Sequence, residues 1–144
     1  MYDAILLPTD GSDGTTGTLE HAIHIAKEDG ATIHALYVVD RRLYMAAESE
    51  TKAEVKKSLG EEGERAIDDV RVRAEEAGLD VEAELIDGIP HREIADYVDR
   101  EGIDLVTMGT HGRTGRDRVA NLGSVTERVV ESVETPVLVV DIGE

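Results

Sequence analysis

The residues best suited to chemistry lie between positions 109 and 127, in the run GTHGRTGRDRVANLGSVTE. The loop in this run begins and ends with glycine. It contains three arginines and only one acidic residue, Asp117. An apolar segment, residues 103–108, precedes the loop as a buried strand, and a helical pattern begins at Ser124. Glycine lets a ligand approach the backbone closely, and a helix start offers unpaired N–H groups with a partial positive charge. The pattern predicts a phosphate-binding loop between a strand and a helix.

The same residues also have a purely structural interpretation. Ser124 and Glu127 have the spacing of a capping box, in which each side chain bonds to the other's backbone N–H. Gly123 would then only shape the entry to the helix. The loop has neither a Walker A lysine nor a G-x-G-x-x-G after a strand, which excludes the two commonest nucleotide loops. Because no nucleophile is paired with a base, and His111 is the only acid–base candidate in the loop, the sequence predicts no catalytic residue.

The elements that must position this loop follow an alternating pattern. Strand-like runs at 3–8, 31–39, 80–87, 103–108 and 137–142 alternate with helical patterns at 16–29, 43–78, 90–101 and 124–133. Strict alternation implies an α/β fold, with a mostly parallel sheet covered by helices on both faces. Gly60 and Gly63 weaken the long helical pattern, so we expect a firm helix only from about Glu64.

Polar residues follow the ends of the first two strands. Asp10 and Asp40 both lie where a parallel strand ends, which is the usual place for ligand groups in such sheets. Capping the next helix is the alternative role for Asp10, although Ser12 and Thr15 are also suitable caps. His34 lies inside the second strand, where we expect it to have a hydrogen-bond partner.

The composition limits the partners of the protein. Its 144 residues suit one domain, and they carry 32 acidic against 15 basic side chains, a formal net charge of -17. Nucleic acid and anionic membranes are therefore not expected as partners. The chain has no cysteine, no visible signal region and no apolar run near the ~18 residues of a membrane span. We expect a cytoplasmic protein.

The surface chemistry suggests adaptation to salt. The chain has a pI of about 4.5, no tryptophan or phenylalanine, and only four lysines. An acidic, lysine-poor surface is typical of a haloarchaeon or another cell with a salt-rich cytoplasm. High salt screens the repulsion between acidic groups, so we expect stability to rise with salt concentration.

Motifs spread along the chain resemble the universal stress protein family, the UspA-like proteins. The matching segments are residues 5–12 (ILLPTDGS), 88–90 (GIP), 108–112 (MGTHG), 122–129 (LGSVTERV) and 135–140 (TPVLVV). The resemblance covers essentially the whole chain. It implies a single domain over residues 1–144 with a Rossmann-like, adenine nucleotide alpha hydrolase-like fold. Its five-stranded parallel sheet would have the order 3-2-1-4-5, which makes strands one and four neighbours.

The ATP-binding branch of this family carries the motif G-x2-G-x9-G-[S/T]. By resemblance, Asp10 and the backbone around Val39 would hold the adenosine, and glycines of the motif would line the ribose and phosphates. ATP, ADP or AMP would be the ligand, possibly with Mg²⁺, and Arg113 would add positive charge. The implied nucleotide-binding residues are Pro8, Thr9, Asp10, Val39, Met108, Gly109, Gly112, Arg113, Gly123, Ser124 and Val125.

The sequence departs from the motif at one place. Ten residues, 113–122, separate Gly112 from Gly123, where the motif has nine. A bulge would absorb the extra residue; otherwise it would displace the phosphate-binding groups, and small displacements of such groups are costly.

The resemblance also implies a biological role. The expected function is a stress-response module that binds ATP and acts as a homodimeric switch or binds an unidentified protein partner. A structural dimer without nucleotide, and a slow ATPase, remain as alternatives. Because the last strand would be an open apolar edge, which invites pairing, we expect a homodimer through residues 137–141.

Overall fold

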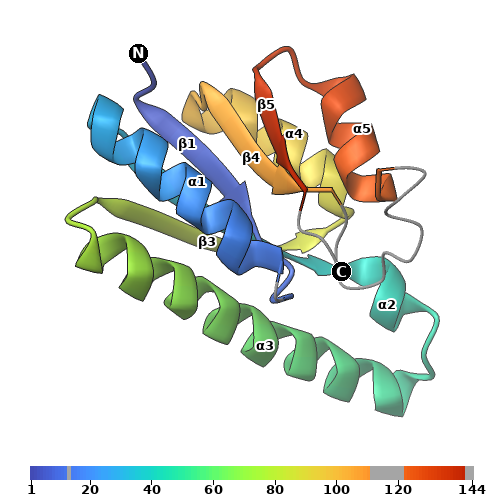
Figure 1. The fold of residues 1–144 in the computed structure, drawn as a ribbon. Helices are drawn as coiled ribbons and strands as arrows, with labels where there is room; N and C mark the ends of the chain where they lie inside the picture. The colour runs from blue at the N-terminus through green and yellow to red at the C-terminus, as the bar shows by residue number, and fades with distance from the viewer. Residues whose placement is uncertain (13, 111–121, 142–144) are drawn as a thin grey trace.

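A five-stranded parallel sheet forms the centre of the molecule (Figure 1). The structure, a computed structural model, describes residues 1–12, 14–110 and 122–141. The strands lie in the order β3-β2-β1-β4-β5, and each neighbouring pair is parallel. The predicted α/β class and the order 3-2-1-4-5 are therefore confirmed. The strands are β1 (Ala4–Pro8), β2 (Thr32–Asp40), β3 (Val81–Gly88), β4 (Leu105–Gly109) and β5 (Val137–Val140).

Helices cover both faces of this sheet, with α1 and α3 in front and α4 behind in Figure 1. Successive residues of a strand point to opposite faces, so Ile5 and Leu7 pack under α1, whereas Leu6 packs with Ile94 of α4 and Val129 of α5. The continuous apolar strands follow from this double burial. The helices are α1 (Gly14–Asp29), α2 (Arg41–Met45), α3 (Ser49–Glu76), α4 (Pro90–Glu101) and α5 (Ser124–Ser132).

The helix α3 is one continuous element of 28 residues. The expectation of a firm helix only from about Glu64 was wrong, because α3 runs through both glycines. Gly63 is buried, and a Cβ atom there would lie 2.5 Å from Cδ1 of Tyr37 and 2.7 Å from Cδ1 of Leu85. Glycine at this position lets α3 pack closely on β2 and β3, and that packing outweighs the poor helix propensity.

The topology brings the ends of β1 and β4 together. These strands are neighbours, with Ile5 opposite Leu105 and Leu6 opposite Val106. The chain leaves β1 toward α1 on one face and leaves β4 toward α5 on the other. This divergence creates the crevice in which open α/β sheets bind ligands. Of the helices in the described part of the chain, none has the length and apolar character to cross a membrane.

Candidate functional site

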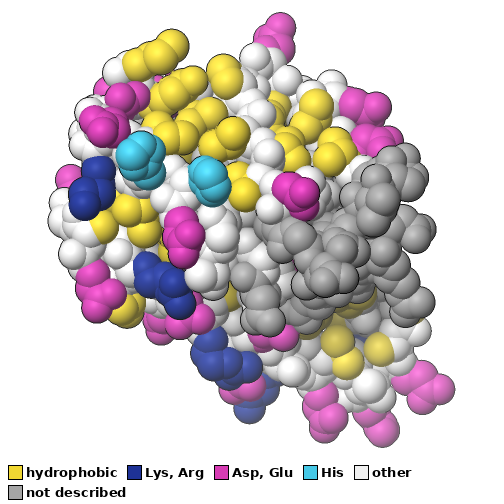
Figure 2. All heavy atoms as spheres, viewed as in Figure 1, with side chains coloured by type: hydrophobic (Ala, Val, Ile, Leu, Met, Phe, Trp, Pro, Cys, Tyr) yellow, Lys and Arg dark blue, Asp and Glu magenta, His cyan; other side chains and the backbone are white. Residues whose placement is uncertain are grey.

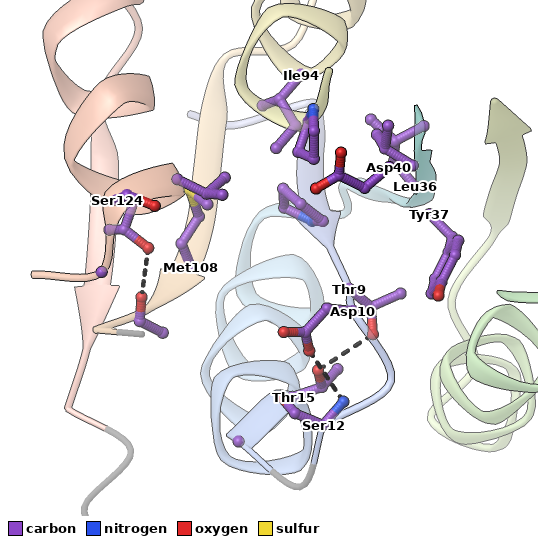
Figure 3. Close-up of a pocket in the computed structure, with 18 of the residues that line it drawn as sticks. Thr9, Asp10, Ser12, Thr15, Leu36, Tyr37, Asp40, Ile94, Met108 and Ser124 are labelled. Carbon is purple, nitrogen blue, oxygen red and sulfur yellow. Dashed lines mark hydrogen bonds between the residues drawn. The ribbon is translucent and has the colours of Figure 1, made fainter. Parts of the chain in front are cut away.

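A cavity of about 670 Å³ lies at the carboxyl edge of the sheet (Figure 3). Its described lining comes from the ends of β1 and β4, the second half of β2, α2 and α3, and the first two turns of α1, α4 and α5. The cavity thus occupies the place that the divergence after β1 and β4 creates. Its volume is within the range of small-molecule sites in proteins.

One side of the cavity is apolar. Leu36 and Val38 of β2, Ile94 of α4 and Met108 of β4 line it, together with Pro8 at the end of β1. Leu36, Ile94 and Met108 are buried members of the core beneath α4 and α5, so they form a stable wall. Figure 3 shows them arranged around the upper part of the site. Such a wall suits a flat ring system of low polarity.

The loop after β1 supplies a polar floor. Asp10 Oδ1 accepts a hydrogen bond from the Ser12 amide at 2.9 Å, and Thr9 Oγ1 accepts one from the Gly11 amide at 3.1 Å. Thr9 Oγ1 also lies 3.1 Å from Thr15 Oγ1. Gly11 has φ +80°, a left-handed conformation that glycine adopts without strain. The bond from Ser12 is an Asx turn inside the loop, which orients the Asp10 carboxylate at the cavity before α1 begins.

The start of α5 offers amide groups to the same cavity. Ser124 and Val125 line it, and they form the first turn of the helix, where N–H groups have no acceptor within the helix. The residue preceding the helix is Gly123, in an extended conformation with no side-chain cap. The alternative interpretation as a capping box was wrong. The N-cap residue is Gly123 rather than Ser124, and the Glu127 amide donates to the Gly123 carbonyl at 2.9 Å.

Two hydrogen bonds anchor the start of α5 to the end of β4. The Gly123 amide donates to the Thr110 carbonyl at 2.7 Å, and Thr126 Oγ1 donates to the Gly109 carbonyl at 2.9 Å. The first amides of α5 are therefore held at a defined place beside the sheet edge. Their N–H groups, together with the positive end of the helix dipole, form an arrangement suited to an anion.

Eight of the predicted nucleotide-binding residues meet in this cavity. Val39 does not line it; its side chain lies on the opposite face among Tyr44 and Ile67, whereas Val38 faces the site. Successive residues of a strand point to opposite faces, and the expectation for Val39 concerned its backbone, so it stays a prediction. Gly112, Arg113 and the ten-residue spacing lie outside the described residues. The residues brought together are Pro8, Thr9, Asp10, Met108, Gly109, Gly123, Ser124 and Val125.

Sequence reasoning missed a charged pair at the cavity. Asp40 and Arg42 both line it, and Asp40 accepts hydrogen bonds from Arg42 Nε at 2.9 Å and Nη2 at 2.7 Å. It also caps α2 by accepting the Arg42 amide at 3.0 Å. Partial burial raises the pKa of Asp40, but the hydrogen bonds and charge of Arg42 outweigh this and lower its pKa below the usual value. The position of Asp40 at a strand end was the available signal.

Within residues 1–12, 14–110 and 122–141, no group of three His, Asp or Glu side chains could hold a metal ion. The described part of the site therefore presents an apolar wall, carboxylates and helix amides. That combination suits a ligand with a ring system at one end and an anionic group at the other.

Comparison with known proteins gives a consistent result. The model of the universal stress protein family matches residues 1–141. Universal stress protein MJ0531 of Methanocaldococcus jannaschii is 42% identical over 141 residues, which cover 97% of this chain and 82% of that protein.

Solved structures agree with this similarity. The structure of MJ0577, also from M. jannaschii, has a TM-score of 0.88 and 34% identity, covering 100% of this chain and 99% of that chain. A universal stress protein solved in complex with cAMP has a TM-score of 0.74 and 25% identity, covering 99% of each chain.

Proposed function

Because this chain belongs to the universal stress protein family, we propose that its cavity binds an adenine nucleotide and that binding controls its activity as a switch or partner-binding module. One observation carries the proposal. A single cavity joins the apolar wall of β2, α4 and β4 to the amides at the start of α5. A nucleotide needs both an apolar surface for its base and donors for its phosphates. The similar protein solved in complex with cAMP supports a nucleotide as the ligand.

The chemistry of the lining suggests how the nucleotide lies. The base packs between Val38, Ile94 and Met108, which form part of the apolar wall. The Asp10 carboxylate, oriented by its Asx turn, accepts hydrogen bonds from ribose hydroxyls. The phosphates accept hydrogen bonds from the amides of Ser124 and Val125. AMP, ADP and ATP all have these parts.

The proposed role is binding and release without a catalytic step. Hydrolysis needs a base that activates water beside the phosphate. Among described residues at the start of α5 the cavity offers hydroxyls and amides, and the Thr126 hydroxyl already donates to the Gly109 carbonyl. Mg²⁺ would enter the site bound to the phosphates of the nucleotide.

The substitution Ser124→Asp tests the phosphate position. A carboxylate in the first turn of α5 stabilises the helix through its dipole, so the fold is retained. The same carboxylate repels a phosphate a few ångströms away, which weakens binding about tenfold or more. We expect nucleotide in the denatured supernatant of the wild type by mass spectrometry, and none from the variant. Calorimetric titration with AMP and ATP gives the affinities.

The matched control is Ser49→Asp, which places the same charge in the first turn of α3. Ser49 does not line the cavity, so this variant should bind nucleotide like the wild type. The proposal is wrong if the folded wild type neither carries a nucleotide nor releases heat when AMP or ATP is added.

A further inference from the structure

Basic residues occur on the helices that border the cavity, although the chain as a whole is strongly acidic. His91 and Arg92 lie in the first turn of α4, Arg128 lies in α5, and Arg42 of α2 lines the cavity together with Pro90. Figure 1 shows α2 and the beginnings of α4 and α5 at the same end of the molecule. We call His91, Arg92, Arg128 and Arg42 the rim cluster.

The charges of the rim cluster act on one another. Partial burial is the first cause that lowers the pKa of His91, and the positive charges of Arg128, Arg92 and Arg42 lower it further. These three arginines come from three different helices, so the cluster is a product of the tertiary fold. Like charges held together in this way repel each other unless an anion lies between them.

The chain has many acidic side chains that could form ion pairs with arginines. Acidic residues outnumber basic ones by 32 to 15, and Figure 2 shows them spread over the face drawn there. Arg71 pairs with Asp68, and Arg100 pairs with Glu84 and Glu101. Within the described residues Arg92 and Arg128 make no ion pair, which is also true of Arg41, Arg65 and Arg73. The guanidinium groups of Arg92 and Arg128 in the rim cluster are therefore available to bind an anionic ligand.

The start of α5 connects this cluster to the proposed phosphate position. Arg128 follows Ser124 by four residues, so both lie on the same side of the helix, about 6 Å apart along its axis. The neighbouring start of α4, which packs against α5, carries His91 and Arg92. A phosphate chain that begins at the Ser124 and Val125 amides therefore extends toward positive charge.

We propose that the rim cluster binds the terminal phosphates of a nucleoside polyphosphate, so that the site prefers ATP to AMP. This assignment rests on the proposed nucleotide function. Arginine suits the role because its planar fork of donors matches phosphate oxygens and keeps its charge. Arg42 would contribute its charge while its Nε and Nη2 atoms stay bonded to Asp40.

Calorimetric titration with AMP, ADP and ATP tests the assignment. It compares the wild type with the double variant Arg92→Gln/Arg128→Gln, at the lowest KCl concentration that keeps both folded by circular dichroism, because salt screens exposed charges. We expect wild-type affinity to rise about tenfold or more from AMP to ATP. The double variant should lose about tenfold in ATP affinity and stay within about twofold of the wild type for AMP.

Arg73→Gln is the matched control, because Arg73 lies in the last turn of α3 and does not line the cavity. It should leave the ratio of ATP to AMP affinity unchanged. If the double variant keeps the wild-type ratio, the rim cluster has no role in binding, while the nucleotide function stands. If no nucleotide binds to the wild type, the nucleotide function itself fails.

Proton uptake gives a second readout that a purely structural role would not change. Terminal phosphates offset the charges of Arg42, Arg92 and Arg128, so ATP binding should raise the pKa of His91. Titrations near pH 6.5 in two buffers of different ionisation enthalpy should then show uptake of protons with ATP and less with AMP. The variant His91→Gln should abolish the difference; an unchanged difference would exclude His91 from the site.

Discussion

The buried pair His34 and Tyr97 joins the sheet to α4. His34 Nδ1 and Tyr97 Oη lie 2.8 Å apart, and both side chains are buried. The expectation that His34 has a hydrogen-bond partner is confirmed. Burial lowers the pKa of His34 and outweighs the charges of Glu82 and Glu101, which act to raise it. Burial, with the charges of nearby acids, also raises the pKa of Tyr97 to about 12. Both shifts favour the neutral form of the side chain, so the pair is uncharged near pH 7.5 in the folded protein.

This neutral histidine should make stability depend on pH. Its pKa is lower in the folded state than in the unfolded state, so the unfolded chain binds more protons below about pH 6.5. Its stabilisation is present above that pH and is lost as the pH falls toward the folded-state pKa. We expect the melting temperature to decrease between pH 7.5 and 5.5, and the variant His34→Gln to show a shallower decrease.

His24→Gln is the control for this experiment, because His24 is exposed on α1. It should keep the wild-type slope. Some slope should also remain in His34→Gln, since the pKa of His91 is lowered as well. Equal slopes in the wild type and His34→Gln would show that the buried imidazole contributes nothing to the pH dependence.

At the level of elements, the sequence predicted each strand and each of the four long helices, because their periodicity is local. The sequence did not predict the continuity of α3 or the short helix α2. Both depend on tertiary contacts: Gly63 packs against Tyr37 and Leu85, and the Tyr44 hydroxyl of α2 donates to the Asp87 carboxylate, with oxygens at 2.6 and 2.7 Å. Partners far apart in the sequence leave no periodic signal.

The two glycines of α3 should respond in opposite ways to alanine. Gly60→Ala adds a Cβ atom in open space and should stabilise the protein by about 0.5–1 kcal/mol through helix propensity. Gly63→Ala gains the same propensity but forces Tyr37 or Leu85 to move, and overpacking of this kind costs about 1–3 kcal/mol. Urea unfolding gives both free energies. A stabilising Gly63→Ala would show that α3 does not need glycine for its close packing.

At the level of the whole molecule, the topology of the sheet determines which residues of the site could be predicted from the sequence. The family resemblance implied eight residues of the cavity. The sequence pattern alone also indicated Asp10, at a strand end, and Gly123 and Ser124, at a helix start, because topology places strand ends at one edge. The pairing of Asp40 with Arg42 required the folded structure, because no periodic pattern in the sequence marks it. The salt dependence expected from the acidic composition stays a prediction.

We propose that the molecule forms a homodimer through β5. Among the residues that the structure describes, this strand pairs with β4 alone, and its residues Val137–Val140 are half-buried and apolar. A charge on such an edge opposes pairing, so Val139→Lys should change the mass measured by light scattering in high KCl from dimer to monomer. Val72→Lys, the same change at an exposed site on α3, should remain dimeric. A monomeric wild type would exclude this interface.

The central position of β1 has a consequence for synthesis of the chain. The Asp104 carboxylate accepts hydrogen bonds from the amides of Asp3 at 2.9 Å and Ala4 at 3.2 Å, which joins the beginning of β1 to the approach to β4. At translation rates of about 5–20 residues per second, roughly 5–20 s pass between the synthesis of β1 and that of β4. During this interval one edge of β1 is open in the nascent protein. Because the cavity needs both β1 and α5, no ligand can assist folding before the chain is almost complete.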